Sequence, residues 1–182
     1  MPVRLTVERG PHAGVARAVI QRRAEAMLAL LQMQKDELSL VLSDDDQLHQ
    51  LNKMYRGKDR STDVLAFAMR EGDFSRVASS GPVALLGDVI VSVPTARKQA
   101  KEHERPLLAE LTMLIAHGLL HLLGWDHETP AKDKRMRAET ERLCAAANAV
   151  DGAAPGRTKP KSHAVRKRTA AKSVARKPSR RT

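Results

Sequence analysis

The chain has 182 residues, of which 42% are hydrophobic and 2% are aromatic, so it is long enough to bury one core and that core must be aliphatic. Its formal net charge is +11, but residues 151–182 hold 11 of the 32 Lys and Arg residues and 1 of the 21 Asp and Glu residues. This leaves 21 basic and 20 acidic residues in residues 1–150, so the charge does not indicate a nucleic-acid-binding fold there and belongs to a basic extension.

The N-terminal part of the chain alternates between strand and helix patterns. Val3–Val7 and Glu37–Leu42 alternate apolar with polar residues, which predicts two half-buried strands. Residues 15–31 place apolar residues at helical spacing opposite a basic face, which predicts an amphipathic helix. Ser43 and the three aspartates after it suit a helix start, with Ser43 as the cap and the acids near the positive end of the dipole. That helix should carry the apolar residues Leu48, Leu51, Met54 and Tyr55.

The rest of the chain continues with two strands and three helices. Residues 56–63 predict a polar loop before an apolar strand over Val64–Met69. Residues 71–83 contain several glycine, proline and serine residues, so we expect an exposed connection there. The apolar pattern of Leu85–Val93 predicts a further strand. Pro94 suits the first turn of a helix. The expected helices cover residues 94–103, 106–123 and 131–148.

This order of elements predicts an α+β fold in which a small mixed four-stranded sheet packs against helices. The domain should cover residues 1–150. Residues 151–182 contain almost no large apolar side chains, so burial cannot offset the entropy of ordering them. We expect a disordered basic tail, which is either a solubilising extension or a contact for RNA or the ribosome.

Cysteine use and hydropathy indicate the compartment. Cys144 is the single cysteine, which excludes an internal disulfide and a cysteine zinc finger. No run of apolar residues approaches the ~20 that span a bilayer, and Arg4, Glu8 and Arg9 interrupt the N-terminus where a secretory signal would be apolar. We therefore expect a soluble, cytoplasmic protein without a membrane partner.

Three histidines between residues 117 and 127 predict a metal site. His117 and His121 are four residues apart and share one face of the predicted helix. Gly124 tolerates the left-handed conformation of helix ends, so the chain can turn and bring His127 back toward the pair. Imidazole suits zinc, copper, iron or nickel better than magnesium or calcium. A pair of core histidines is the alternative, and the third histidine favours the metal.

Three protein nitrogens leave a tetrahedral ion one ligand short, which is typical of catalytic zinc. Bound zinc lowers the pKa of a water to about 7 and polarises carbonyl or phosphoryl oxygens, so the pattern predicts hydrolysis. Asp126 could be a fourth ligand, an acceptor that orients a ring, or a helix-terminal acid. We expect the ring-orienting role.

The same histidine spacing occurs in metzincin proteases, and the helix is therefore zincin-like. Those enzymes carry a glutamate directly after the first histidine as the general base. Here Gly118 occupies that position and cannot accept a proton. A metallopeptidase would need a carboxylate from elsewhere in the chain.

Three further motifs precede the histidines. They are Asn52–Asp59 (NKMYRGKD), Thr62–Phe67 (TDVLAF) and Leu86–Ile90 (LGDVI). Together and in this order, the four motifs resemble the YbeY family of bacterial rRNA-maturation endoribonucleases over about residues 1–148. The chain departs from the family's pattern in its basic tail and at Ala68, where the family usually has proline.

The resemblance implies a YbeY-like, metal-dependent endoribonuclease domain over residues 1–150. It implies Zn²⁺ at His117, His121 and His127, and a catalytic arginine at Arg56 beside the metal cleft. It also implies cleavage of single-stranded RNA in 3′-end maturation of the small-subunit (16S) rRNA and in ribosome quality control. The implied partners are rRNA and the ribosome or small-subunit assembly factors.

Several polar residues near these motifs have two interpretations each. Arg56 offers a planar fork of donors for a phosphate, or it is a surface arginine in a charged loop. Lys58 and Arg60 extend a phosphate-binding edge or, as we expect, are solvated. Asp63 and Asp88 should hold loops or ligand rings by hydrogen bonds.

Two questions stay open at this point. Trp125 stacks on a base or, as we expect, is buried beside the helix end. The general base is not identified, so the nucleophile is a water or the 2′-hydroxyl of the RNA. A non-enzymatic assembly factor, in which zinc pins the helix end and the tail docks on rRNA, is the alternative to an enzyme.

Overall fold

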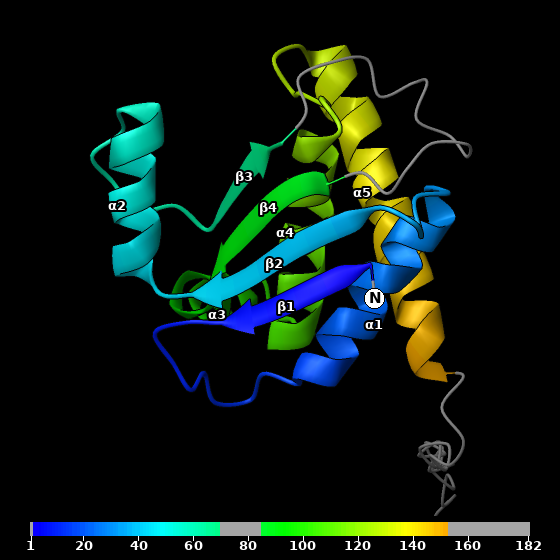
Figure 1. Ribbon diagram of the computed structural model, residues 1–182, viewed down its shortest axis with the longest axis horizontal. Helices are drawn as coiled ribbons and strands as arrows, with labels where there is room; N and C mark the ends of the chain where they lie inside the picture. The colour runs from blue at the N-terminus through cyan, green and yellow to red at the C-terminus, as the bar shows by residue number, and fades with distance from the viewer. Residues whose placement is uncertain (1, 70–84, 153–182) are drawn as a thin grey trace, which may run out of the picture.

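The computed structural model describes residues 2–69 and 85–152 (Figure 1). The connection expected over residues 71–83 lies outside the described residues, and so does the expected tail beyond its first two residues. The described elements are β1 (Val3–Val7), α1 (Arg17–Leu30), β2 (Glu37–Ser43), α2 (Asp45–Arg56), β3 (Val64–Ala68), β4 (Leu85–Ser92), α3 (Val93–Glu102), α4 (Leu107–Leu122) and α5 (Pro130–Gly152).

The strands form the expected mixed four-stranded sheet, in the order β1-β2-β4-β3. β1, β2 and β4 run parallel, whereas β3 pairs antiparallel with β4 and forms one edge. The fold is therefore α+β, as the sequence predicts.

The main core lies between one face of the sheet and the helices α1, α4 and α5. Figure 1 shows α4 behind the sheet in this view, with α1 and α5 beside it. Because side chains alternate along a strand, Leu38, Leu40 and Leu42 of β2 all face this core and are buried. α4 buries most of its length there, since it is apolar on nearly every side.

A smaller cluster lies on the other face of the sheet, under α2. It joins Leu48 of α2 to Leu65 of β3 and Ile90 of β4. The helix buries less than its sequence suggests, because Met54 is 73% exposed and Tyr55 is 65% exposed. The helix does carry the four expected apolar residues, but two of them face solvent.

The cap of α2 is one residue later than predicted. Ser43 is the last residue of β2, and the side chain of Asp44 accepts a hydrogen bond of 2.9 Å from the backbone N–H of Gln47. The prediction of Ser43 as the cap is wrong because this residue still pairs with β4, opposite Ser92. The helix ends at Gly57, whose φ of 64° is left-handed.

The last helix continues past the predicted end of the domain. Asp151, expected from the sequence to lie in the tail, belongs to α5 and forms an ion pair of 2.5 Å with Arg23 of α1. Arg23 also donates a hydrogen bond of 2.6 Å to the hydroxyl of Thr112 on α4. Arg23 thus links α1 to the end of α5 and to α4. Over residues 2–69 and 85–152, no helix combines the length and the apolar character needed to cross a membrane.

Candidate metal centre

The three predicted histidines lie together at the end of α4. Each ring offers one ligand atom, and these atoms all lie within 4.8 Å of one another. The Nε2 atoms of His117 and His121 are 3.1 Å apart. The ring of His127 lies 5.8 Å from that of His117 and 5.4 Å from that of His121, centroid to centroid. The group therefore could hold a metal ion.

The turn after α4 brings the third histidine to the pair. Gly124 has a φ of 79°, which is the left-handed conformation predicted for it. Its N–H donates to the carbonyl of His121 at 3.1 Å, and the N–H of Trp125 donates to that of Leu120 at 3.0 Å. The reversed chain then returns toward α4 and carries His127 with it. Trp125 packs against the main core, as expected.

A backbone carbonyl orients the second ligand. Nδ1 of His121 lies 3.0 Å from the carbonyl oxygen of Trp125. Since a carbonyl can only accept, Nδ1 carries the hydrogen and Nε2 keeps its lone pair for an ion. Metal-ligating histidines commonly donate their other nitrogen in this way.

The predicted role of Asp126 is wrong. Its carboxylate accepts from the N–H of Glu128 at 3.1 Å and from Nζ of Lys132 at 2.8 Å. These bonds tie the loop to the first turns of α5. Residue types and their spacing do not predict the role of the Trp125 carbonyl, because every residue carries this main-chain group.

The surroundings of His117 and His121 favour the neutral form of both rings. Burial lowers the pKa of His117 below its ordinary value, and the neighbouring His127 lowers it further. Burial also lowers the pKa of His121, and the neighbouring His117 lowers it further. A neutral imidazole has a lone pair to give, so both rings are ready to bind a cation near pH 7.

The donor set fits a transition-metal ion. Two nitrogens bound about 2.0–2.1 Å from a tetrahedral ion lie about 3.3–3.4 Å apart, which is close to the separation of the Nε2 atoms in His117 and His121. Three imidazoles suit a borderline cation, whereas magnesium and calcium prefer oxygen ligands.

The histidines open into a pocket of about 210 Å³ that also includes the predicted arginine. Nη2 of Arg56 donates a hydrogen bond of 3.3 Å to the carbonyl of Ala66, on the edge strand β3. Arg56 thus reaches the metal pocket from the end of α2. The pocket residues are Arg56, Thr62, Asp63, Val64, Ala66, His117, Gly118, His121 and His127.

Asp63 is the one acid that lines this pocket among the described residues, and it holds its loop as predicted. One carboxylate oxygen accepts from the N–H of Val64 at 2.8 Å, and the other accepts from Nε2 of Gln99 at 3.0 Å. Both oxygens are therefore held by donors of the chain. The buried side chain of Asn52 also supports the loop, because it donates to the carbonyl of Arg60 at 2.8 Å.

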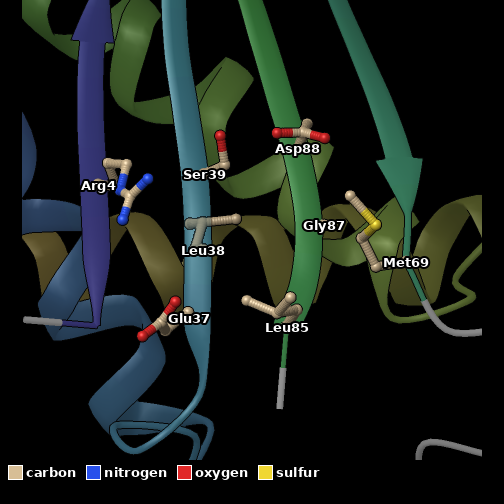
Figure 2. Close-up of a pocket in the computed structure, with 8 residues that line it drawn as sticks. All are labelled: Arg4, Glu37, Leu38, Ser39, Met69, Leu85, Gly87 and Asp88. Atoms are coloured by element: carbon tan, nitrogen blue, oxygen red, sulfur yellow. The ribbon is translucent and has the colours of Figure 1, made fainter. Parts of the chain in front are cut away.

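Three other predicted residues lie outside the pocket. Lys58 and Arg60 are exposed in the loop after α2, as expected. Asp88 does not orient a ligand ring, because it lies on the face of the sheet in a separate hollow of about 360 Å³. Figure 2 shows Asp88, Ser39 and Arg4 on neighbouring strands there, where they pair in register. The sequence could not place Asp88, since strand register decides which face it occupies.

The position of the metzincin glutamate is closed by packing. A Cβ atom on Gly118 would lie 2.7 Å from Cγ1 of Val89 and 3.1 Å from Cγ2 of Val64. α4 thus lies too close to β3 and β4 for a longer side chain to fit without movement. The fold therefore disfavours a glutamate at position 118, where the sequence already has glycine.

Comparison with known proteins identifies the family. A model of the family described as Endoribonuclease YbeY matches residues 10–148. The chain belongs to the YbeY family. It is accordingly a nuclease, a hydrolase that acts on RNA.

Related proteins of the YbeY family are similar over much of the chain. The Endoribonuclease YbeY of Anaeromyxobacter dehalogenans is 45% identical over 154 residues, which cover 85% of this chain and 75% of the relative. That of Myxococcus xanthus is 48% identical over 120 residues, which cover 66% of this chain and 40% of the relative. The solution structure of TM1509 from Thermotoga maritima shares the fold, with a TM-score of 0.56, 23% identity, and coverage of 84% of this chain and 93% of that chain.

Proposed function

We propose that this YbeY-family chain is a zinc-dependent endoribonuclease specific for single strands. It acts in the cytoplasm in 3′-end maturation of small-subunit (16S) rRNA and in ribosome quality control. Its partners are rRNA and the ribosome or small-subunit assembly factors. One observation carries the proposal: His117, His121, His127 and Arg56 line one pocket of a chain from an endoribonuclease family.

Zinc is the ion that we assign to the three histidines. When bound, it would supply Lewis-acid stabilisation of a phosphoryl oxygen and activation of a water. The chain holds the ligands ready for it, because the Trp125 carbonyl fixes the tautomer of His121 and burial keeps His117 and His121 neutral.

Arg56 is proposed to bind the scissile phosphate. A guanidinium presents five donors in a rigid fork and can hold two phosphate oxygens at once. The bond from Arg56 to Ala66 is long and uses one nitrogen, so a phosphate in the pocket can compete for the group. Charge that develops on the phosphate during cleavage would be stabilised by the same donors.

The nucleophile is a water or the 2′-hydroxyl of the RNA, and not a protein side chain. The hydrogen bonds that Asp63 accepts from Val64 and Gln99 fix the orientation of this carboxylate, and the general base stays open. Attack by the 2′-hydroxyl of the RNA leaves a 2′,3′-cyclic phosphate, whereas direct hydrolysis leaves no cyclic end. The ends of the products therefore distinguish the two routes.

The experiment that tests the proposal uses zinc-loaded chain and a short single-stranded RNA from the 3′ end of the small-subunit precursor. Arg56→Ala should slow cleavage by about 10²–10³-fold with unchanged zinc content, since the substitution removes stabilisation of developing charge. Arg22→Ala is the matched control, because this arginine is exposed on α1 and lies outside the pocket. It should stay within a few-fold of the parent.

Parallel reactions identify other activities. A duplex of the same sequence and a peptide should both resist the zinc-loaded chain. If the RNA is bound but never cut, the chain is a ribosome-assembly factor rather than an enzyme. If cleavage is equally fast in Arg56→Ala and in the parent, the assignment of Arg56 is wrong.

A further inference from the structure

Tyr55 is the one tyrosine of the chain, and it faces solvent. Its side chain, in the last turn of α2, is 65% exposed. The other aromatic residues that the structure describes behave differently, since Phe67 and Trp125 are partly buried against core clusters. An exposed ring forgoes the stabilisation that burial would give it, so its position calls for another explanation.

Phe67 holds the ring of Tyr55 without covering it. The two ring centroids lie 5.2 Å apart at an interplanar angle of 63°, which is an edge-to-face contact. Such a contact restricts the rotation of Tyr55 and leaves much of the ring open to solvent. A restrained ring loses less entropy when a ligand stacks on it.

The ring lies directly outside the metal pocket. Two consecutive residues of α2 contact two consecutive residues of β3: Tyr55 contacts Phe67, and Arg56 donates to Ala66. Ala66 lines the metal pocket, whereas Phe67 belongs to the cluster on the other face of the sheet. The edge strand β3 therefore lies between the tyrosine ring and the pocket.

Two further cations lie in the loop that follows Arg56. Lys58 and Arg60 follow Arg56 in the loop and are exposed. Neither forms an ion pair with any residue in 2–69 or 85–152. An aromatic ring beside cations that can contact phosphates is the combination that binds single-stranded nucleic acids.

We infer that Tyr55 is a stacking platform for one nucleobase next to the scissile phosphate. The inference rests on the proposed function, because it takes RNA as the molecule that crosses the pocket. A base in a duplex is already stacked on both faces, so it has no face to offer. Tyr55 thereby contributes to the preference for single strands, and it tolerates any sequence because every base has a π-face.

The test compares Tyr55→Ala, Tyr55→Leu and Tyr55→Phe with the parent full-length chain. Met54→Ala is the matched control, because Met54 is a similarly exposed apolar residue on the same turn. Binding of a short fluorescent single-stranded RNA is measured by anisotropy, with a chelator present to prevent cleavage. A second probe has the same length and charge but lacks all bases. Circular dichroism checks that each variant is folded.

Stacking predicts a definite pattern across these proteins. Tyr55→Ala and Tyr55→Leu should weaken binding of the RNA by about 5- to 140-fold, which corresponds to the usual range for one stacked base. Tyr55→Phe and Met54→Ala should stay within about twofold of the parent. All variants should bind the abasic probe equally, because its phosphates contact the cations and not the ring.

Two results would overturn the inference. One is an equal fall in affinity for both probes in Tyr55→Ala, which would indicate a structural effect. The other is recovery in Tyr55→Leu, which would show that apolar volume suffices without a π-face. Cleavage by the zinc-loaded parent is scored separately. If the parent cleaves RNA and Tyr55→Ala binds RNA as well as the parent does, the stacking platform is rejected and the nuclease function stands. If binding depends on Tyr55 but the parent does not cleave RNA, the nuclease function is rejected and the platform stands.

Discussion

His121 shows how a single imidazole serves two purposes. Its Nδ1 donates to the carbonyl of Trp125 at 3.0 Å, while its Nε2 faces Nε2 of His117. The first contact fixes the ring and the tautomer, and the second atom is left for a ligand. The residue types and their spacing predict His121 as a ligand, but a bond to a main-chain carbonyl emerges only when the turn is folded.

Replacement of His121 should reduce metal affinity sharply. His121→Ala removes one of three ligands, so zinc affinity should fall at least about 100-fold, given that removal of an outer partner alone costs about 10–100-fold. His49→Ala is the control, because His49 is an exposed histidine that contacts Asp59. Competition with a chromophoric chelator measures both affinities. Equal zinc affinity in the parent and in His121→Ala would show that the three histidines do not form the zinc site.

Cys144 should be an unreactive thiol. Burial raises the pKa of Cys144 above its ordinary value, so less of it is thiolate near pH 7. Since the thiolate is the nucleophile, alkylation of the folded chain should be at least about tenfold slower than in urea. Reaction with a thiol reagent, followed by mass spectrometry, measures the rates. Equal rates in the two states would show that the fold does not protect the Cys144 thiol.

At the scale of elements, the close contact between α4 and the sheet determines what the helix can carry. Gly118 faces Val89 and Val64 at distances that leave no room for a Cβ atom. Because of this contact, α4 packs closely against β3 and β4. His117 therefore lies in the same pocket as Arg56, which contacts the edge strand β3. Position 118 is thus glycine for a packing reason.

Gly118→Ala should destabilise the fold, although alanine is the better helix former. The gain in helix propensity is about 1 kcal/mol, whereas overpacking of a dense core costs about 1–3 kcal/mol. We expect a net decrease of about 1 kcal/mol in the free energy of unfolding. Chemical denaturation measures it. A more stable Gly118→Ala variant would mean that the valines can move and that the close contact is not a constraint.

Most elements follow from the sequence because hydrophobic periodicity reports which face is buried. The four strands, five helices and mixed sheet of the described residues are of this kind. The errors arise where tertiary contacts decide. Ser43 remains in β2 because β4 extends far enough to pair with it, and Tyr55 stays exposed because α2 covers little of the sheet. The place of Asp88 differs from the prediction because strand register, rather than residue type, selects its face.

At the scale of the whole molecule, α5 connects the metal centre to the start of the basic segment. Its first turns bind the histidine loop through Lys132 and Asp126, and its last turn binds α1 through Asp151 and Arg23. A helix of 23 residues is about 34 Å long. The described part of the chain therefore ends about one helix length from the histidine loop. The 30 residues that follow in the sequence include 11 basic residues.

Deletion of residues 153–182 should separate RNA attraction from catalysis. We expect a weaker salt dependence of RNA binding, with the slope of log affinity against log salt reduced by about 0.7 for each phosphate that the segment neutralises in the full chain. Cleavage of a short single strand should stay within a few-fold of the full chain, because the pocket residues are unchanged. Binding titrations at several salt concentrations measure the slope. An unchanged slope would show that the segment does not contact RNA.

Zinc titration of cleavage tests most directly whether the three histidines form a catalytic metal site. Metal-free chain receives increasing zinc, and the rate of single-strand RNA cleavage is measured together with bound zinc. The rate should rise in proportion to bound zinc and level off at about one ion per chain, as three convergent histidines require. His121→Ala should show neither the binding nor the rise. Cleavage at full rate without zinc, or in zinc-free His121→Ala, would contradict the account.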